Sequence, residues 1–185
     1  MRDAEYYLVV DLEATCDDHG AVPRHESEII EIGAVLVDGK RLRPVAELMT
    51  FVRPVLHPGL TAFCTELTTI TQDQVDDAPR FPAAAARLAA FGAGALFCSW
   101  GNYDRNQLTA DAARHGLASP LGPDHLNVKQ LFADRLGFRR GLGTHAAMAR
   151  VGLTPEGTHH RGIDDARNIA RLLAVALRRT AAEVA

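Results

Sequence analysis

Residues 6–13 read YYLVVDLE, a run of aromatic and β-branched side chains that ends in two acids. Such a run predicts a central strand that is buried on both faces. Because side chains alternate along a strand, Asp11 and Glu13 project to the same face at its carboxyl end. Carboxylates held that close repel each other unless a cation separates them, which favours a site for Mg²⁺ or Mn²⁺. Taken alone, a solvated strand end explains this pattern better.

Apolar runs further along the chain predict the rest of a sheet. Residues 29–37 and a weaker run over 47–52 flank an Asp-Gly pair, which is typical of a hairpin. Two more strands are expected at 95–100 and from His125. Helical patterns, several of them ended by glycine, cover a short segment opened by a Thr71–Gln74 capping box, then 81–91, 102–115, 129–136, 144–150 and about 163 onward. This order predicts an α/β fold with helices layered on a mixed sheet.

Length and composition limit the class of protein. The 185 residues are 47% hydrophobic and 23% charged, which favours one folded domain over 1–185 and excludes disorder as the main state. Three cysteines without a C-x-x-C pair argue against a disulfide framework or a structural zinc site. No long apolar run or signal-peptide pattern is present, so we expect a cytoplasmic protein without a membrane segment. The net charge of −3 gives no overall basic footprint, but bound cations would offset acids at a nucleic-acid site.

Two further segments carry residues suited to the same chemistry. Asp104 follows the strand expected at 95–100 and lies at the start of a helix, where the helix dipole alone also favours an acid. The segment HHRGIDD, residues 159–165, opens the last helix. A histidine just outside a helix and an aspartate in its first turn can converge on one point, with the histidine acting as a base.

Together these segments resemble the DEDDh superfamily of 3′–5′ exonucleases. The resemblance is carried by D-L-E, by Asp104, and by His160 with Asp165 at H-x-x-x-x-D spacing. The resemblance is narrower still, to the branch of histone-mRNA 3′-exoribonucleases, enhanced-RNAi exonucleases and bacterial sporulation-pathway-inhibitor exonucleases. Five stretches carry this narrower resemblance: VVDLEATCDD, SEIIEIGAVLVD, FVRPVLHPGLTAFCTELTTIT, SWGNYD and GTHHRGIDDARNIARLL. It extends over about residues 6–173 and implies a ribonuclease-H-like fold with a five-stranded mixed sheet.

The resemblance also implies a site and a mechanism. Two divalent ions, Mg²⁺ or Mn²⁺, would be held by four acids, and His160 would be the general base; the acids are Asp11, Glu13, Asp104 and Asp165. The ions would clamp a phosphodiester, and the products would be a nucleoside 5′-monophosphate and a shortened strand. Gly162 departs from the alanine that is usual in the wider superfamily. The animal enzymes carry a separate nucleic-acid-binding domain, for which this chain has no room, so recognition of a structured RNA is not implied.

Adjacent pairs leave a choice that spacing in the family resolves. Residues one apart on a helix point about 100° away from each other, so only one of Asp164 and Asp165 should face the ions. The family spacing selects Asp165 and His160. Asp164 would then stabilise the helix start, and His159 would be exposed or would contact a ligand-bearing residue.

Residues that could contact substrate have structural alternatives. Trp100 could stack on a terminal base or belong to the core. Leu67 and Thr68 lie where the family packs a wedge against the 3′ nucleotide, but a packing or capping role fits them as well. Arginines at 139, 140 and 161 could contact phosphates or form a solvated face.

The sequence therefore predicts a metal-dependent 3′–5′ exonuclease with nucleic acid, RNA rather than DNA, as its partner. Three alternatives stay open: the same chemistry on DNA, a silent nucleic-acid-binding module, and a phosphodiesterase or phosphatase for small molecules. The sequence does not decide between RNA and DNA, because discrimination by the 2′-hydroxyl depends on a few contacts. Digestion of matched RNA and DNA substrates distinguishes these two activities.

Overall fold

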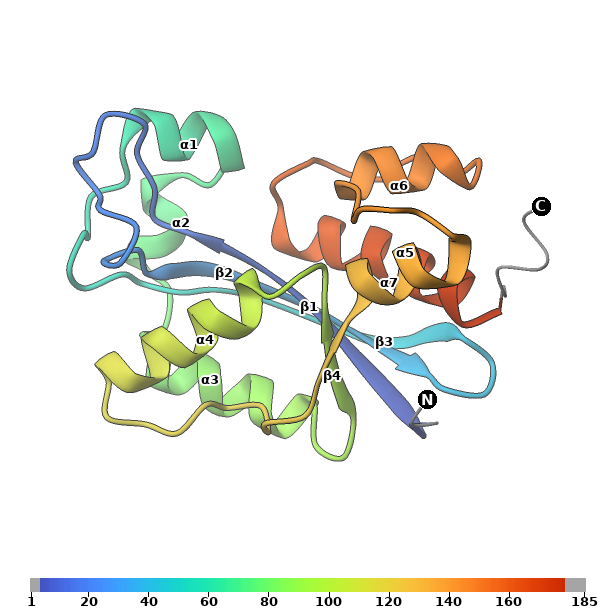
Figure 1. Cartoon of the computed structure of the whole chain (residues 1–185). Coiled ribbons are helices and arrows are strands. Elements are labelled where there is room, and N and C mark those ends of the chain that lie inside the picture. Colours follow the sequence, from blue (N-terminus) through green and yellow to red (C-terminus); the bar gives the residue numbers. More distant parts are fainter. Residues whose placement is uncertain (1–3, 179–185) are drawn as a thin grey trace.

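A five-stranded mixed sheet organises the part of the chain that the computed structural model describes, residues 4–178 (Figure 1). The strand order is β3-β2-β1-β4-β5, so the strand that carries the D-L-E motif is central, as predicted. β1 pairs antiparallel with β2 and parallel with β4; β2–β3 is an antiparallel hairpin, and β4–β5 is parallel. The strands are β1 Tyr6–Ala14, β2 Ile29–Asp38, β3 Arg43–Phe51, β4 Leu96–Ser99 and β5 His125–Asn127.

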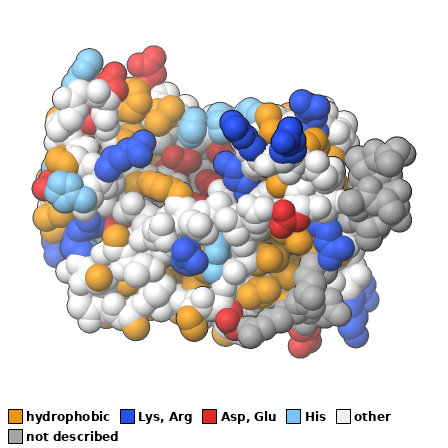
Figure 2. Space-filling view, viewed as in Figure 1, with side chains coloured by type: hydrophobic (Ala, Val, Ile, Leu, Met, Phe, Trp, Pro, Cys, Tyr) orange, Lys and Arg blue, Asp and Glu red, His pale blue; other side chains and the backbone are white. Residues whose placement is uncertain are grey.

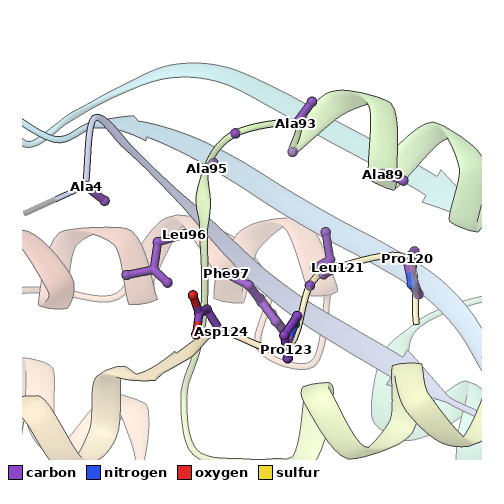
Figure 3. Close-up of a pocket in the computed structure, with 13 residues that line it drawn as sticks. Ala4, Ala89, Ala93, Ala95, Leu96, Phe97, Pro120, Leu121, Pro123 and Asp124 are labelled. Atoms are coloured by element: carbon purple, nitrogen blue, oxygen red, sulfur yellow. The ribbon is translucent and has the colours of Figure 1, made fainter. Parts of the chain in front are cut away.

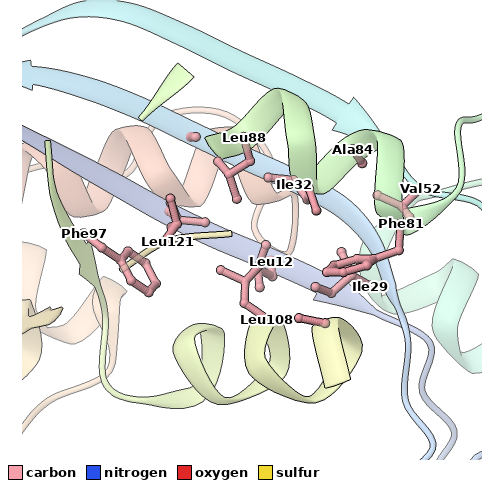
Figure 4. Packing of buried hydrophobic residues seen from close by; sticks show 14 of the residues in the cluster. Leu12, Ile29, Ile32, Val52, Phe81, Ala84, Leu88, Phe97, Leu108 and Leu121 are labelled. Atoms are coloured by element: carbon pink, nitrogen blue, oxygen red, sulfur yellow. The ribbon is translucent and has the colours of Figure 1, made fainter. Parts of the chain in front are cut away.

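Helices cover both faces of this sheet. Within residues 4–178 they are α1 Ala62–Thr68, α2 Gln72–Asp76, α3 Phe81–Phe91, α4 Tyr103–Arg114, α5 Val128–Leu136, α6 Thr144–Arg150 and α7 Gly162–Arg178. One face packs against α3 and α4, where Leu12, Leu88 and Leu108 share a buried cluster (Figure 4). On the other face Val9 packs against Ile169 and Leu173 of α7.

The alternation of side chains along β1 decides which face receives the acids. Leu8, Val10 and Leu12 point into the α3–α4 core, whereas Tyr7 and Val9 belong to the cluster that contains α7. Because the period of a strand is two residues, Asp11 and Glu13 continue the face of Tyr7 and Val9. The fold therefore directs both carboxylates toward the start of α7.

The α/β class and the mixed five-stranded sheet are confirmed, and most elements agree with the sequence pattern. β1 extends two residues beyond Leu12, and β3 begins at Arg43 rather than Glu47. The Thr71–Gln74 capping box is formed, and α3 has the predicted bounds. The structure describes the last helix to Arg178; the predicted continuation to the C-terminus lies outside the described residues.

Helix α1 was not anticipated from the sequence. It has seven residues, and its threonines and phenylalanine have low helix propensity. Its start depends on a local cap: Thr61 Oγ1 accepts a hydrogen bond from Cys64 N at 3.0 Å and donates one to Cys16 O at 2.7 Å. That second contact fixes α1 beside the segment that leaves β1. Within residues 4–178, no helix is both long and apolar enough to cross a membrane.

Candidate active site

Three segments that are distant in sequence bring the predicted acids together. Asp11 and Glu13 come from β1, and Asp104 lies in the first turn of α4. Leu12 N donates a hydrogen bond to Asp104 Oδ1 at 3.1 Å, so this carboxylate is tied to the backbone between the two β1 acids. The start of α4 is thereby fixed to the carboxyl end of β1.

The start of α7 supplies the remaining two residues. Asp165 is buried, and its Oδ2 accepts a hydrogen bond from the backbone N of His160 at 2.8 Å. Ligand atoms of Glu13, His160 and Asp165 all lie within 4.8 Å of one another. His160 has a φ of 60°, a left-handed conformation that is uncommon for a non-glycine residue and that turns the chain into the helix. All five predicted residues thus meet at one place.

The electrostatics of this cluster are those of acids that lack a counter-charge. Burial raises the pKa of Asp11 well above its ordinary value, and nearby carboxylates, Asp104 foremost, raise it further. Burial raises the pKa of Glu13 to about 8, with Asp165 the largest of the charges that add to this effect. The pKa of Asp104 is about 7, raised by burial and held back by hydrogen bonds, including that from Leu12 N. A divalent cation would remove these penalties.

A further buried acid, Glu31, strengthens the fit of the cluster to hard cations. Glu31 is directly opposite Glu13 in the β1–β2 register and is 0% exposed. Its Oε2 pairs with Arg161 Nε at 2.9 Å, but Oε1 is buried with no hydrogen-bond partner among the described residues. An orphaned buried oxygen is costly, and oxygen donors without protein partners are what Mg²⁺ and Mn²⁺ bind.

Sequence reasoning passed over Glu31, although its signal was present in the quoted stretch SEIIEIGAV. An acid inside an apolar strand that is buried on both faces is rarely tolerated without a function or a partner. Tyr103 was also missed. Its side chain is 54% exposed beside Asp104, and desolvation, followed by the Asp104 charge, raises the pKa of its hydroxyl. An exposed aromatic ring next to the acids could stack on a base.

The structure separates the adjacent pairs as the family spacing indicated. Asp164 turns away from the cluster: it accepts a hydrogen bond from Thr158 N at 2.9 Å and pairs with Arg167 at 2.8 Å. The side chain of His159 is 47% exposed, and its Nδ1 lies 3.3 Å from Asp165. Asp165 is therefore the acid of the first turn that faces the site, with His159 in contact with it.

Of the side chains predicted to contact substrate, one is exposed to solvent and two are held by contacts within the fold. Leu67 on α1 is exposed, which suits a wedge against a nucleotide. Thr68 is 0% exposed, and its hydroxyl donates to Cys64 O and accepts from Ile70 N, which favours the capping alternative. Trp100 donates from Nε1 to Leu142 O at 3.0 Å and packs on Phe132, which favours the core alternative.

The arginines divide in the same way. Arg161 forms an ion pair with the buried Glu31, so its guanidinium is not part of a solvated face. Arg139 and Arg140 are exposed in the loop between α5 and α6, where either a phosphate contact or a solvated face is compatible with their positions.

Acidic side chains line the floor of a hollow in the space-filling view, between α1 on one side and α5 with α6 on the other (Figure 2). Histidine and Lys/Arg side chains lie around its rim. A separate cavity of about 500 Å³ lies at the opposite end of β4 from Asp104, between Ala4, the α3–β4 turn and residues 120–124 (Figure 3). Among the described residues that line it, Asp124 is the one acid, so this lining differs from the several acids of the hollow.

Comparison with known proteins agrees with this geometry. The family model RNase T, described as exonuclease, matches residues 8–173. Mouse ERI1 exoribonuclease 3 is 31% identical over 180 residues, which cover 91% of this chain and 52% of that protein. The Drosophila melanogaster 3′–5′ exonuclease Snipper is 31% identical, and the match covers 94% of this chain and 69% of that protein. The chain thus spans about half the length of the mammalian exoribonuclease it matches.

Solved structures give the same result. The nuclease domain of 3′hExo, a DEDDh family member bound to rAMP, superposes with a TM-score of 0.84 at 27% identity, covering 95% of this chain and 92% of that one. The fold is that of a DEDDh nuclease domain, which confirms the predicted ribonuclease-H-like topology. The chain belongs to the RNase T exonuclease family and is similar to the ERI1 and 3′hExo enzymes. A likeness to the bacterial sporulation-pathway branch stays a prediction.

Proposed function

We propose that this protein is a metal-dependent 3′–5′ exonuclease that shortens RNA or short single strands and releases nucleoside 5′-monophosphates. The observation that carries this proposal is the convergence of four acids and one histidine from β1, α4 and the start of α7. Three independent segments would not place so many carboxylates together without a cation to compensate for their repulsion.

The four acids would hold two divalent ions. Asp11 is the natural shared ligand because the charges of all the other acids act on it. Glu13 and Asp165 would complete one site, and Asp104 the other. When bound, such ions polarise a phosphodiester and make an attacking water more acidic. Leu12 N and His160 N keep Asp104 and Asp165 oriented for this task through the backbone hydrogen bonds.

His160 would accept the proton of the attacking water at a ring nitrogen. Burial, and then the nearby His159, lower the pKa of the His160 imidazole below its usual 6.5. The ring is therefore neutral at pH 7 and able to take a proton. Its position at the turn before α7, within reach of Glu13 and Asp165, places the base at the edge of the acidic cluster.

RNA is the substrate class that the relatives favour. The mouse relative is an exoribonuclease, and the 3′hExo nuclease domain was solved with the ribonucleotide rAMP. Among the residues near the cluster, Leu67 and Tyr103 are exposed and apolar or aromatic, which suits contact with the terminal nucleotide rather than with a duplex.

Digestion of matched 5′-labelled RNA and DNA single strands with Mg²⁺ or Mn²⁺ tests the proposal. We expect a ladder of shortened RNA and its disappearance with EDTA. Asp11→Asn should abolish the ladder, whereas Asp18→Asn, an exposed acid in the same stretch, should not alter it.

Each of the other outcomes would support a different function for this protein. Preferential digestion of DNA would make it an exodeoxyribonuclease, and binding of RNA without release of nucleotide would make it a silent binding module. Hydrolysis of mononucleotide esters without digestion of any polymer would indicate a small-molecule phosphodiesterase.

A further inference from the structure

Three histidine rings lie next to one another at the rim of the acidic cluster. The ring centroids of His159 and His160 lie 3.9 Å apart, and those of His145 and His159 lie 4.1 Å apart. His145 comes from α6, and the other two from the turn before α7. The exonuclease mechanism uses His160 alone, so two adjacent imidazoles have no role in it.

The two unused imidazoles share a carboxylate with the acidic cluster. His159 Nδ1 lies 3.3 Å from both Oδ1 and Oδ2 of Asp165. A ligand atom of His145 joins them, and the three donor atoms lie within 4.8 Å of one another. In a tetrahedral zinc site, bonds of about 2.0–2.2 Å put neighbouring donors about 3.4 Å apart. The His159–Asp165 pair already has this spacing, and the donor atom of the exposed His145 lies within 4.8 Å of both partners.

The donor set differs in kind from the acidic cluster. Two nitrogens and one oxygen suit Zn²⁺ and other borderline ions, whereas Mg²⁺ prefers oxygen ligands alone. His145 and His159 are both exposed, so an ion can enter from solvent. Three protein ligands leave a fourth position for water, as in open zinc sites.

We propose that His145, His159 and Asp165 form a Zn²⁺ site that inhibits the enzyme by taking Asp165 away from the magnesium cluster. The inhibitory effect rests on the proposed function of Asp165, but the site itself does not. One Zn²⁺ would link α6 to the start of α7 and would compete with Mg²⁺ for a single carboxylate.

Calorimetric titration of Zn²⁺ into untagged protein, without Mg²⁺ and at rising Mg²⁺ concentrations, tests the site. We expect one Zn²⁺ per chain that depends on His145 and whose apparent affinity falls as Mg²⁺ rises, because both ions need Asp165. His145→Asn should weaken this binding at least about tenfold, since loss of a metal ligand costs no less than loss of its supporting contacts. Asp11→Asn should retain the binding, and His19→Asn, an exposed histidine in the β1–β2 connection, should behave as the unaltered protein.

Activity supplies the second readout. His145→Asn should keep Mg²⁺-dependent activity, because it alters neither the four acids nor His160, and should be inhibited only at a Zn²⁺ concentration at least about tenfold higher. Co²⁺ bound to the unaltered protein should show the intense visible absorption of a tetrahedral centre, and His145→Asn should lose it.

Two results overturn the proposal: absence of Zn²⁺ binding when Mg²⁺ is left out, or equal Zn²⁺ affinity in the unaltered protein and His145→Asn. The second result would place the ion in the acidic cluster. If Zn²⁺ binds as expected but no polymer is digested, the proposed function fails while the zinc site stands.

Discussion

Gly33 of β2 and Gly162 at the start of α7 are in direct backbone contact. A Cβ on Gly33 would lie 2.1 Å from the carbonyl carbon of Gly162, and a Cβ on Gly162 would lie 3.0 Å from the carbonyl oxygen of Asp11. The helix therefore begins against the bare backbone of the sheet. This close approach brings Asp165, three residues along the helix, to the acids of β1.

Gly33→Ala should displace the start of α7 and remove activity. The three atoms nearest to the added Cβ all belong to the backbone of Gly162 and Ile163, so no side chain can yield, and we expect a loss of about 3 kcal/mol, at the upper end of the usual cost of overpacking. Urea unfolding followed by circular dichroism measures the cost. Gly59→Ala is a matched control, because a Cβ there meets nothing within 4 Å; an equal loss in both variants would contradict the packing argument.

Gly162→Ala should have a smaller effect. The added methyl group lies 3.0 Å from Asp11 O and 3.1 Å from Gly33 N, contacts that a shift of a few tenths of an ångström would relieve. We expect activity to persist at a reduced level, measured on the same labelled RNA; complete loss would mean that the helix start cannot move at all.

The residues that carry local signals were readable from the sequence. The apolar runs, such as the one before Asp11, predicted the sheet, and the glycines after several helices predicted their ends, because burial and capping act within a few residues. An acid inside an apolar strand made Glu31 readable too, but neither its position opposite Glu13 nor helix α1 was readable in that way. Whether Glu31 faces Glu13 depends on strand register, and α1 depends on the Thr61 contact to Cys16, 45 residues away. Such long-range contacts leave no local pattern.

The metal-free protein should lose stability as the pH rises. The pKa values of Glu13 and Asp104 are raised to about 8 and about 7 from ordinary values of 4.5 and 3.8. Between about pH 4 and pH 8 the folded state therefore binds more protons than the unfolded state, so the free energy of unfolding falls across this window. Urea midpoints in EDTA at several pH values measure the fall.

Mg²⁺ should flatten that dependence, because a bound cation compensates for the charges that raise the pKa values. Asp104→Asn should flatten it in EDTA as well, with a loss of activity. A midpoint that rises with pH in the metal-free protein would contradict the charge distribution described above.

The Arg161–Glu31 pair should be strongly coupled. Glu31 is fully buried, so Arg161→Met leaves an uncompensated charge and should destabilise the fold by about 3–5 kcal/mol. Glu31→Gln removes that charge and should restore much of the stability in the double variant. A double-mutant cycle in EDTA measures the coupling; additive effects would show that the ion pair contributes nothing.

Leu67→Ala should weaken substrate binding without changing stability. The side chain is exposed, so its loss creates no cavity, but a wedge against the 3′ nucleotide would disappear. We expect KM for a short RNA to rise several-fold, which corresponds to about 1 kcal/mol of lost apolar contact. Leu117→Ala, at a similarly exposed leucine, should leave KM unchanged. Equal KM values in all three proteins would remove Leu67 from the substrate site.

His160→Asn tests the proton acceptor while respecting the backbone. Asparagine tolerates the left-handed conformation that His160 adopts at a φ of 60°, so the turn before α7 should persist. Loss of a general base lowers turnover by about 10²–10⁴-fold, while Mg²⁺ affinity measured by calorimetry should stay close to that of the unaltered protein. The pKa of His160 is lowered, so the acidic limb of the rate profile in saturating Mg²⁺ should lie below pH 6.5 and should vanish in His160→Asn. An acidic limb that survives the substitution would assign the proton transfer to another group.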